Sequence, residues 1–193
     1  MAGKTGKLRI IGGQWRSRNI TFANVEGLRP TTNRVRETIF NWLQSSLLNA
    51  NCLDLFSGSG ALGFEAASRG AKSVVMVEKE AAVIRHLKDN VEMLSAESVK
   101  VLKESAETFL QSGADRFSEP FDVIFLDPPF NKMLLEKCVN ELECGGWLAE
   151  DAQIYIECEK HLALDFIPTN WSLHRQKKAG QVCFSLYVRN NID

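Results

Sequence analysis

A carboxylate, two prolines and an aromatic ring, Asp127-Pro128-Pro129-Phe130, follow an apolar stretch of the chain. Residues 121–126 (FDVIFL) are β-prone and apolar except for Asp122, which predicts a buried strand. The prolines end that strand, because neither has an N–H to donate and each fixes its own φ. An acceptor carboxylate, free carbonyls and a ring would suit a flat base with an exocyclic amine. An ordinary strand-end turn also uses such residues, since Asp-Pro pairs are common in turns.

A glycine-rich loop lies upstream of this signature. Gly58, Gly60 and Gly63 match G-x-G-x-x-G between an apolar strand and a helical pattern over residues 61–68. Glu78 closes the next apolar run, where an acid can accept hydrogen bonds from ribose hydroxyls. These features fit a dinucleotide and S-adenosylmethionine equally well, because both ligands contain such a ribose.

Asp54 distinguishes between the two ligands. It lies in the strand just before the loop, where a negative charge would repel a pyrophosphate. S-adenosylmethionine has no phosphate and carries two cations, an α-ammonium and a sulfonium. We therefore expect S-adenosylmethionine as the cofactor, with Asp54 near its methionine end and Glu78 on its ribose.

Charge is distributed unevenly, although the net charge is only −1. Residues 1–36 carry +7 and residues 37–193 carry −8. Strand-like runs at 8–11 and 19–22 flank Gly12-Gly13 and Trp15, which predicts a folded basic hairpin rather than a passive tail. Arginines beside an exposed aromatic ring suit RNA, through phosphate contacts and stacking on unpaired bases. We expect substrate contacts from five arginines: Arg16, Arg18, Arg29, Arg34 and Arg36.

The chain of 193 residues, 45% of them hydrophobic, predicts one soluble domain with an ample core. No apolar run approaches the roughly 20 residues of a membrane span, and the basic N-terminus lacks the apolar segment of a signal peptide. Five cysteines form no C-x-x-C pair and three histidines are scattered, which predicts reduced thiols and no metal site. We expect a cytoplasmic protein with no membrane contact.

The elements that must position these residues alternate between strand and helix. A parallel sheet covered on both faces is predicted from this alternation. Right-handed crossovers bring the carboxyl ends of the first and fourth strands to one edge, so residues 58–60 and 127–130 should converge there. Residues 172–177 and 182–189 predict a terminal antiparallel hairpin, completing a mostly parallel seven-stranded α/β sheet. The predicted strands are 51–56, 73–78, 98–103, 121–126 and 152–157, and the predicted helices 34–48, 60–68, 81–94, 105–112 and 133–143.

Arg34 and Arg36 fall in the first turn of the predicted helix 34–48, an unfavourable position for a cation with respect to the helix dipole. Either Glu37 compensates them locally or they serve a partner. We divide the chain into a basic hairpin extension, residues 1–33, and a main domain, residues 34–193.

The chain resembles the class I S-adenosylmethionine-dependent methyltransferases. Residues 54–63 match their cofactor loop, and residues 127–130 match the (Asp/Asn)-Pro-Pro-(Tyr/Phe) signature of enzymes that methylate amino or amide nitrogens. Asn33 and Ser105 depart from the pattern, since relatives often have an acid at the first position and an Asn or Asp facing adenine at the second. Further blocks resemble the RsmD family of bacterial 16S rRNA guanine-N2 methyltransferases: Ile10–Arg16, Gly27–Thr31, Arg34–Thr38, Phe40–Leu43 and Asn170–Arg175.

The resemblance implies a Rossmann-like fold, S-adenosylmethionine as cofactor, and one guanine of 16S rRNA as substrate within an assembled or assembling small subunit, with no protein partner predicted. Asp127 and the Pro128 carbonyl would accept the hydrogens of the guanine N2 amine, so that its lone pair points at the methyl group. Phe130 would hold the unpaired or flipped base. The implied cofactor contacts are Asp54, Phe56, Gly58, Gly60, Glu78 and Ser105.

Three alternatives stay open. An adenine-N6 methyltransferase shares the four-residue signature, although those that act on DNA usually carry a target-recognition domain for which this chain has no room. A dehydrogenase fits the glycines but leaves Asp54 and residues 127–130 unexplained. A non-catalytic RNA-binding assembly factor needs only the basic hairpin, and an activity assay would separate it from an enzyme.

Overall fold

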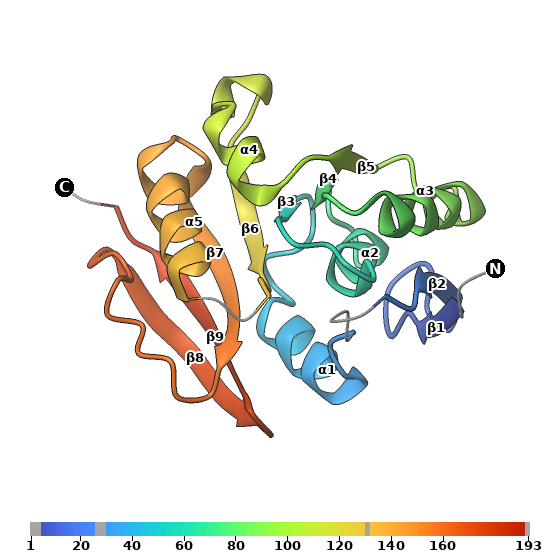
Figure 1. Ribbon diagram of the computed structural model, residues 1–193, viewed down its shortest axis with the longest axis horizontal. Helices are drawn as coiled ribbons and strands as arrows, with labels where there is room; N and C mark the ends of the chain where they lie inside the picture. Colours follow the sequence, from blue (N-terminus) through green and yellow to red (C-terminus); the bar gives the residue numbers. More distant parts are fainter. Residues whose placement is uncertain (1–4, 26–29, 130–131, 192–193) are drawn as a thin grey trace.

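A seven-stranded sheet forms the centre of the protein (Figure 1). The structure is a computed structural model that describes residues 5–25, 30–129 and 132–191. The strand order is β5-β4-β3-β6-β7-β9-β8, with parallel pairing from β5 to β7 and antiparallel pairing of β9 with both neighbours. The predicted α/β fold with a terminal hairpin is thus confirmed. The strands are β3 (Asn51–Asp54), β4 (Ser73–Glu78), β5 (Val99–Lys103), β6 (Phe121–Leu126), β7 (Leu148–Glu159), β8 (Trp171–Ala179) and β9 (Val182–Arg189).

Helices cover both faces of the sheet. Residues of α1 (Asn33–Trp42), α2 (Ala61–Ser68) and α3 (Ala81–Leu94) share one buried cluster with the strands. Residues of α4 (Ala106–Gln111) and α5 (Lys132–Cys144) share the other. Because both faces of the sheet are buried, the sequences of the central strands are continuously apolar and do not alternate between apolar and polar residues. A short 3₁₀ helix, Ala114–Arg116, follows α4.

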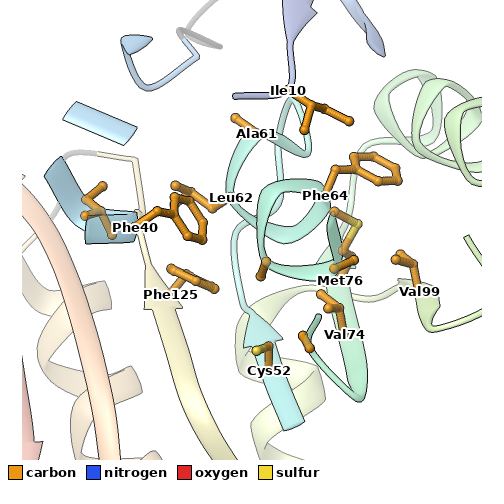
Figure 2. Packing of buried hydrophobic residues seen from close by; sticks show 14 of the residues in the cluster. Ile10, Phe40, Cys52, Ala61, Leu62, Phe64, Val74, Met76, Val99 and Phe125 are labelled. Carbon is orange, nitrogen blue, oxygen red and sulfur yellow. The ribbon is translucent and has the colours of Figure 1, made fainter. Parts of the chain in front are cut away.

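Aromatic rings connect the first helical layer to the sheet. Phe40 of α1 packs on Phe125 of β6 with ring centroids 5.8 Å apart and the rings tilted by 42°, and Figure 2 shows the two side chains as neighbours. Phe125 also makes an edge contact with Tyr155 of β7 at 6.3 Å. On the opposite face, the ring centroids of Phe109 and Trp147 lie 4.7 Å apart. Phe125 and Tyr155 lie on one face of the sheet. Because side chains alternate along a strand, Glu157, two residues beyond Tyr155 in β7, lies on that face as well.

The basic N-terminal segment is a two-stranded hairpin, β1 (Thr5–Arg9) with β2 (Asn19–Ala23), as predicted. It packs on α2 and α3 and contributes to the core of that layer. The Asn90 side chain bonds both backbone groups of Thr21, at 3.0 and 2.7 Å. Trp15 is only 7% exposed, so the prediction of an exposed ring is wrong: the backbone N–H of Trp15 donates to the Ser68 hydroxyl at 3.0 Å and holds the loop against α2.

Several element boundaries differ from those predicted, two of them by four residues or more. The helix predicted to reach residue 48 ends at Trp42, and turns carry Leu43 and Leu47 into the core instead. Asn49 then takes a left-handed φ of 63°, which no helix continues through. Strand β7 is longer than predicted at both ends, and its register against β6 shifts between Phe121 and Val123. None of the described helices is long and apolar enough to cross a membrane.

Candidate active site

The two signatures converge at the carboxyl edge of the sheet. Strands β3 and β6 are parallel neighbours, and Asp54 is paired with Phe125. The glycine loop and residues 127–129 therefore leave adjacent strands at the same level. This convergence was predicted from the crossover rule, and the edge between such strands is where ligands bind in open α/β sheets.

Left-handed glycines shape the loop. Gly58 has φ 46° and Gly60 has φ 77°, a region that side chains other than glycine rarely adopt. A Cβ at Gly60 would also lie 2.7 Å from the Phe64 ring, so the position excludes a side chain on steric grounds. The Gly60 N–H donates to the Ser57 carbonyl at 2.7 Å, which closes the turn before α2.

Glu78 ties the loop to the end of the neighbouring strand. One of its carboxylate oxygens accepts from the Gly58 N–H at 3.1 Å, and the other accepts from the N–H groups of Lys79 and Glu80 at 2.7 and 2.9 Å. A carboxylate offers about four acceptor positions, so a fourth remains for a hydroxyl donor. The half-buried Glu78 beside the left-handed glycines thus fits the ribose contact that the cofactor requires.

Asp54 lies beneath the loop and is only 2% exposed. Its carboxylate accepts from the backbone N–H of Gly63 at 3.1 Å and from that of Phe56. Burial raises the pKa of Asp54 to about 7. The side chain therefore organises the loop and places a carboxyl group beneath it. Its position near the methionine end of the cofactor stays a prediction.

Asp127 is surrounded by other acidic groups. Burial, then the nearby Glu157, then Asp54 raise the pKa of Asp127 well above its usual range, while a hydrogen bond from Thr31 opposes the rise. Leu126, the last residue of β6, is paired with Ile156, so Asp127 directly follows β6 at the level of Glu157 in β7. Pro128 is buried and Pro129 is exposed. Phe130 lies outside the described residues.

Three side chains near Asp127 were not predicted from the sequence to belong to the site: Thr31, Tyr155 and Glu157. The Tyr155 hydroxyl donates to a carboxylate oxygen of Glu157 at 2.7 Å. Tyr155 is fully buried and Glu157 is half-buried. A signal for Glu157 was available, because it is the one acid in the apolar run 154–158 (IYIEC) and follows the predicted strand pattern.

The arginines that were predicted to contact substrate differ in their exposure. Arg16, Arg18 and Arg34 are exposed, and Arg18 also donates to the Met93 carbonyl at 2.7 Å. Arg29 lies outside the described residues. The prediction that Arg36 contacts substrate is wrong, because its side chain is 0% exposed and is bonded within the fold.

Arg36 belongs to a buried ion network that joins the hairpin to α2. It donates to the Arg9 carbonyl at 2.9 Å and to the Asn33 side chain at 2.7 Å. Its guanidinium lies 3.6 Å from the carboxylate of Glu65, which is also fully buried. Arg69 approaches the same carboxylate at 2.8 Å. The charge of Arg36 is compensated by Glu65 and, to a smaller extent, by Glu37, so no partner is needed to account for its position.

The two remaining predicted cofactor residues have structural contacts of their own. Ser105 is the N-cap of α4, and its hydroxyl accepts from the Thr108 N–H at 3.1 Å. Phe56 is half-buried and packs against the second cluster. Their contacts with adenine or methionine stay predictions.

Two surface hollows lie at the opposite, amino-terminal edge of the sheet. One of about 140 Å³ is lined by residues around Trp147, and one of about 330 Å³ includes Asp122 and Asp151. Neither contains residues of the two signatures. The chemistry is therefore assigned to the carboxyl edge, where the glycine loop and Asp127 meet.

A family model described as "Conserved hypothetical protein 95" matches residues 8–188. The chain belongs to this family. It is 49% identical over 186 residues to the Escherichia coli (strain K12) protein named "Ribosomal RNA small subunit methyltransferase D", covering 96% of this chain and 91% of that protein. It is 45% identical over 187 residues to the Haemophilus influenzae protein of the same name, with 94% of each chain covered.

Solved structures agree with this membership. The yhhF protein from Escherichia coli superposes with a TM-score of 0.85 at 48% identity, over 96% of this chain and 99% of that one. The Thermus thermophilus 16S rRNA N2 G1207 methyltransferase, solved with AdoMet and guanosine, has a TM-score of 0.73 at 19% identity, over 97% of this chain and 50% of that one. The second likeness concerns the fold alone, which is the Rossmann-like methyltransferase fold predicted from the sequence.

Replacing Glu78 with alanine is expected to weaken S-adenosylmethionine binding by roughly 1.5–3 kcal/mol, because a hydrogen-bonded charge is removed. Titration calorimetry measures the change. Glu80→Ala is the matched control, since it removes an exposed acid two residues away. Thermal melting of each variant establishes that it is folded. An unchanged affinity in folded Glu78→Ala would remove Glu78 from the cofactor site.

Proposed function

We propose that this protein transfers the methyl group of S-adenosylmethionine to the N2 amine of one guanine in 16S rRNA, within the small ribosomal subunit or its precursor. The observation that carries the proposal is the position of Asp127 and Pro128 at the end of β6, beside the glycine loop that follows β3. The names of the two relatives above support the ribosomal substrate. The acceptor carboxylate beside a cofactor loop supports an amine as the methylated group.

The chemical difficulty lies in the amine. The lone pair of guanine N2 is delocalised into the ring, so the nitrogen is a weak nucleophile. Bound S-adenosylmethionine supplies a methyl group made electrophilic by the sulfonium. When Asp127 accepts an N2 hydrogen, the nitrogen becomes more pyramidal and its lone pair is freed for in-line attack. The new N–C bond forms as the S–C bond breaks, and the N–H proton then passes to the carboxylate or to water.

The acidic surroundings of Asp127 suit this reaction. Positive charge develops on nitrogen during the transfer, and a carboxylate fixed in a water-poor site stabilises it more strongly than water does. The charges of Glu157 and Asp54 both raise the pKa of Asp127 in this structure. Cations near these groups favour their ionised forms, so a sulfonium cofactor and a developing ammonium lower the free energy cost of burying them.

The exposed arginines of the hairpin provide the surface for RNA in this proposal. Replacing Arg16 and Arg18 with alanine is expected to weaken binding to small subunits. The slope of log K against log salt should fall by about 1 for each phosphate that the variant no longer neutralises. Affinity for S-adenosylmethionine should be unchanged, because both residues lie outside the sheet edge. Filter binding across a salt series measures the slope.

A matched control removes two exposed lysines elsewhere, Lys72 and Lys137, which lie at the start of β4 and on α5. This variant loses the same charge, so a change confined to the arginine pair identifies local contacts rather than net charge. If the arginine variant keeps the parent's salt slope, the hairpin covers α2 and α3 without contacting RNA.

Nucleoside mass spectrometry of rRNA tests the proposed function in cells. Deleting the gene is expected to remove one N2-methylguanosine from 16S rRNA, and the parent gene should restore it whereas Asp127→Ala should not. Loss of a methylated adenine instead would favour the adenine-N6 alternative. Unchanged rRNA modification would leave an assembly role and contradict the proposal.

A further inference from the structure

Glu157 is a second carboxylate at the catalytic position that the reaction above does not use. Strands β6 and β7 place it beside Asp127, one residue beyond the pair Leu126 and Ile156. Phe125 and Tyr155 pack edge to face in the first helical layer, so Glu157, two residues beyond Tyr155 in β7, lies on that face of the sheet. Asp127 directly follows β6 and is near enough to Glu157 for the two carboxyl groups to interact. The two carboxylates therefore lie side by side at the edge where a base must enter.

The orientation of Glu157 is fixed by its neighbour. The hydroxyl of Tyr155 donates to Oε2 of Glu157 at 2.7 Å, and Tyr155 is itself fully buried. A buried phenol that holds one carboxylate oxygen leaves the other oxygen oriented and available as an acceptor. Such an arrangement is rigid, as a recognition group must be.

Guanine has a complementary pair of donors. Its Watson–Crick edge presents the N1–H beside the N2 amine, whereas adenine has an unprotonated N1 and no amine at C2. One carboxylate on N2 and a neighbouring carboxylate on N1–H would bind guanine and would repel the N1 lone pair of adenine. Polar groups that are left unpaired with the wrong substrate are a strong source of discrimination.

We propose that Glu157, held by Tyr155, accepts the N1–H of the target guanine and determines the specificity of the site for guanine. This inference rests on the proposed function, because it assigns the base contacts of that same reaction. Burial raises the pKa of both carboxyl groups in the free protein, and the nearby Glu157 raises that of Asp127 further. The two N–H donors of guanine would compensate the paired charges.

The test compares guanine with a base that lacks its N1–H and its O6 oxygen, and the Glu157 variant identifies the part of the discrimination that depends on N1–H. Small subunits are reconstituted with 16S rRNA that carries either guanine or 2-aminopurine at the methylated position. 2-Aminopurine keeps the reactive N2 amine but lacks the N1–H. The parent is expected to methylate guanine with a kcat/KM roughly ten- to a hundredfold higher, the usual range for one base contact. In Glu157→Gln the ratio should fall toward one, because an amide can either accept from N1–H or donate to an unprotonated N1.

Two further variants separate recognition from structure. Glu159→Gln removes the same charge two residues further along β7 and should keep the parent's ratio. Tyr155→Phe frees the Glu157 carboxylate and should lower the ratio partly. S-adenosylmethionine affinity serves as the folding control for all three variants.

The outcomes are distinct. If Glu157→Gln slows both substrates equally and the ratio is unchanged, Glu157 has only a structural role and the inference is wrong. If the parent methylates both bases equally, nothing in the site recognises N1–H and the inference is again wrong. If the parent methylates no guanine in reconstituted subunits or in subunits from cells, the proposed function fails and the inference fails with it.

Discussion

Replacement of Asp127 with alanine is expected to lower the single-turnover rate of methyl transfer by at least ~10²-fold, the effect typical of removing a positioned transition-state group. The change removes both a hydrogen-bond acceptor and a negative charge from the nitrogen that becomes positive. Rapid-quench measurements at saturating cofactor isolate the chemical step. An alanine variant with a near-normal rate would remove Asp127 from the mechanism.

Asp127→Asn distinguishes an acceptor from a base. We expect this variant to keep substantial activity, because an amide oxygen also accepts a hydrogen bond, and water can take the proton after the nitrogen is methylated. If the carboxylate must remove the proton during transfer, the asparagine variant should be nearly as slow as the alanine variant. A graded series supports the acceptor role.

The pH dependence of kcat/KM for methyl transfer follows from the raised pKa of Asp127 in the free protein. Because the ionised form is the acceptor, the kcat/KM of the parent should fall as pH falls through that raised pKa. Asp127→Asn has no such group at this position, so its profile should be flatter. Identical profiles for the two proteins would assign the ionisation to another residue.

The second large effect concerns stability. Replacing Glu65 with alanine is expected to lower the free energy of unfolding by about 3–5 kcal/mol, because it leaves Arg36 buried without its counterion. The carboxylate of Glu65 also accepts from the backbone N–H groups of Ile11 and Gly12, both at 2.8 Å, and from Arg69. Urea unfolding monitored by circular dichroism measures the decrease.

Glu107→Ala is the control for this experiment. Glu107 lies 3.8 Å from Lys137, and both side chains are about half exposed. Its removal should change stability little, since surface pairs are screened by water. A Glu65→Ala variant as stable as Glu107→Ala would mean that the hairpin is not anchored by the buried network. Glu65→Gln should fall between the two, because the amide retains an acceptor for the backbone.

Most of the fold could be predicted from local patterns. The bounds of β6, β9 and α3 were predicted to the residue, since prolines, glycines and clear apolar periodicity mark their ends. The end of α1 was misplaced because Leu43 and Leu47 keep helical spacing while turns, rather than a helix, bury them. Apolar periodicity indicates which residues are buried, but it does not show whether a helix or a series of turns buries them.

Only the part of the site that depends on strand order could be predicted from the sequence. The convergence of the glycine loop and Asp127 follows from strand order, which a repeating β-α pattern predicts. The burial of Trp15 and Arg36 depends on the packing of the hairpin against α2, far along the chain, and flanking charges pointed the opposite way. Glu157 was not predicted because its place in the site depends on Asp127, which follows the neighbouring strand.

Methyl transfer by the purified protein tests the central claim most directly. Small subunits that lack the modification are incubated with methyl-labelled S-adenosylmethionine, and the 16S rRNA is then digested and analysed by mass spectrometry. The expected result is one labelled N2-methylguanosine per subunit at a single position, and none with Asp127→Ala. Label on adenine, label on ribosomal protein, or no label with a folded protein that binds S-adenosylmethionine would contradict the account.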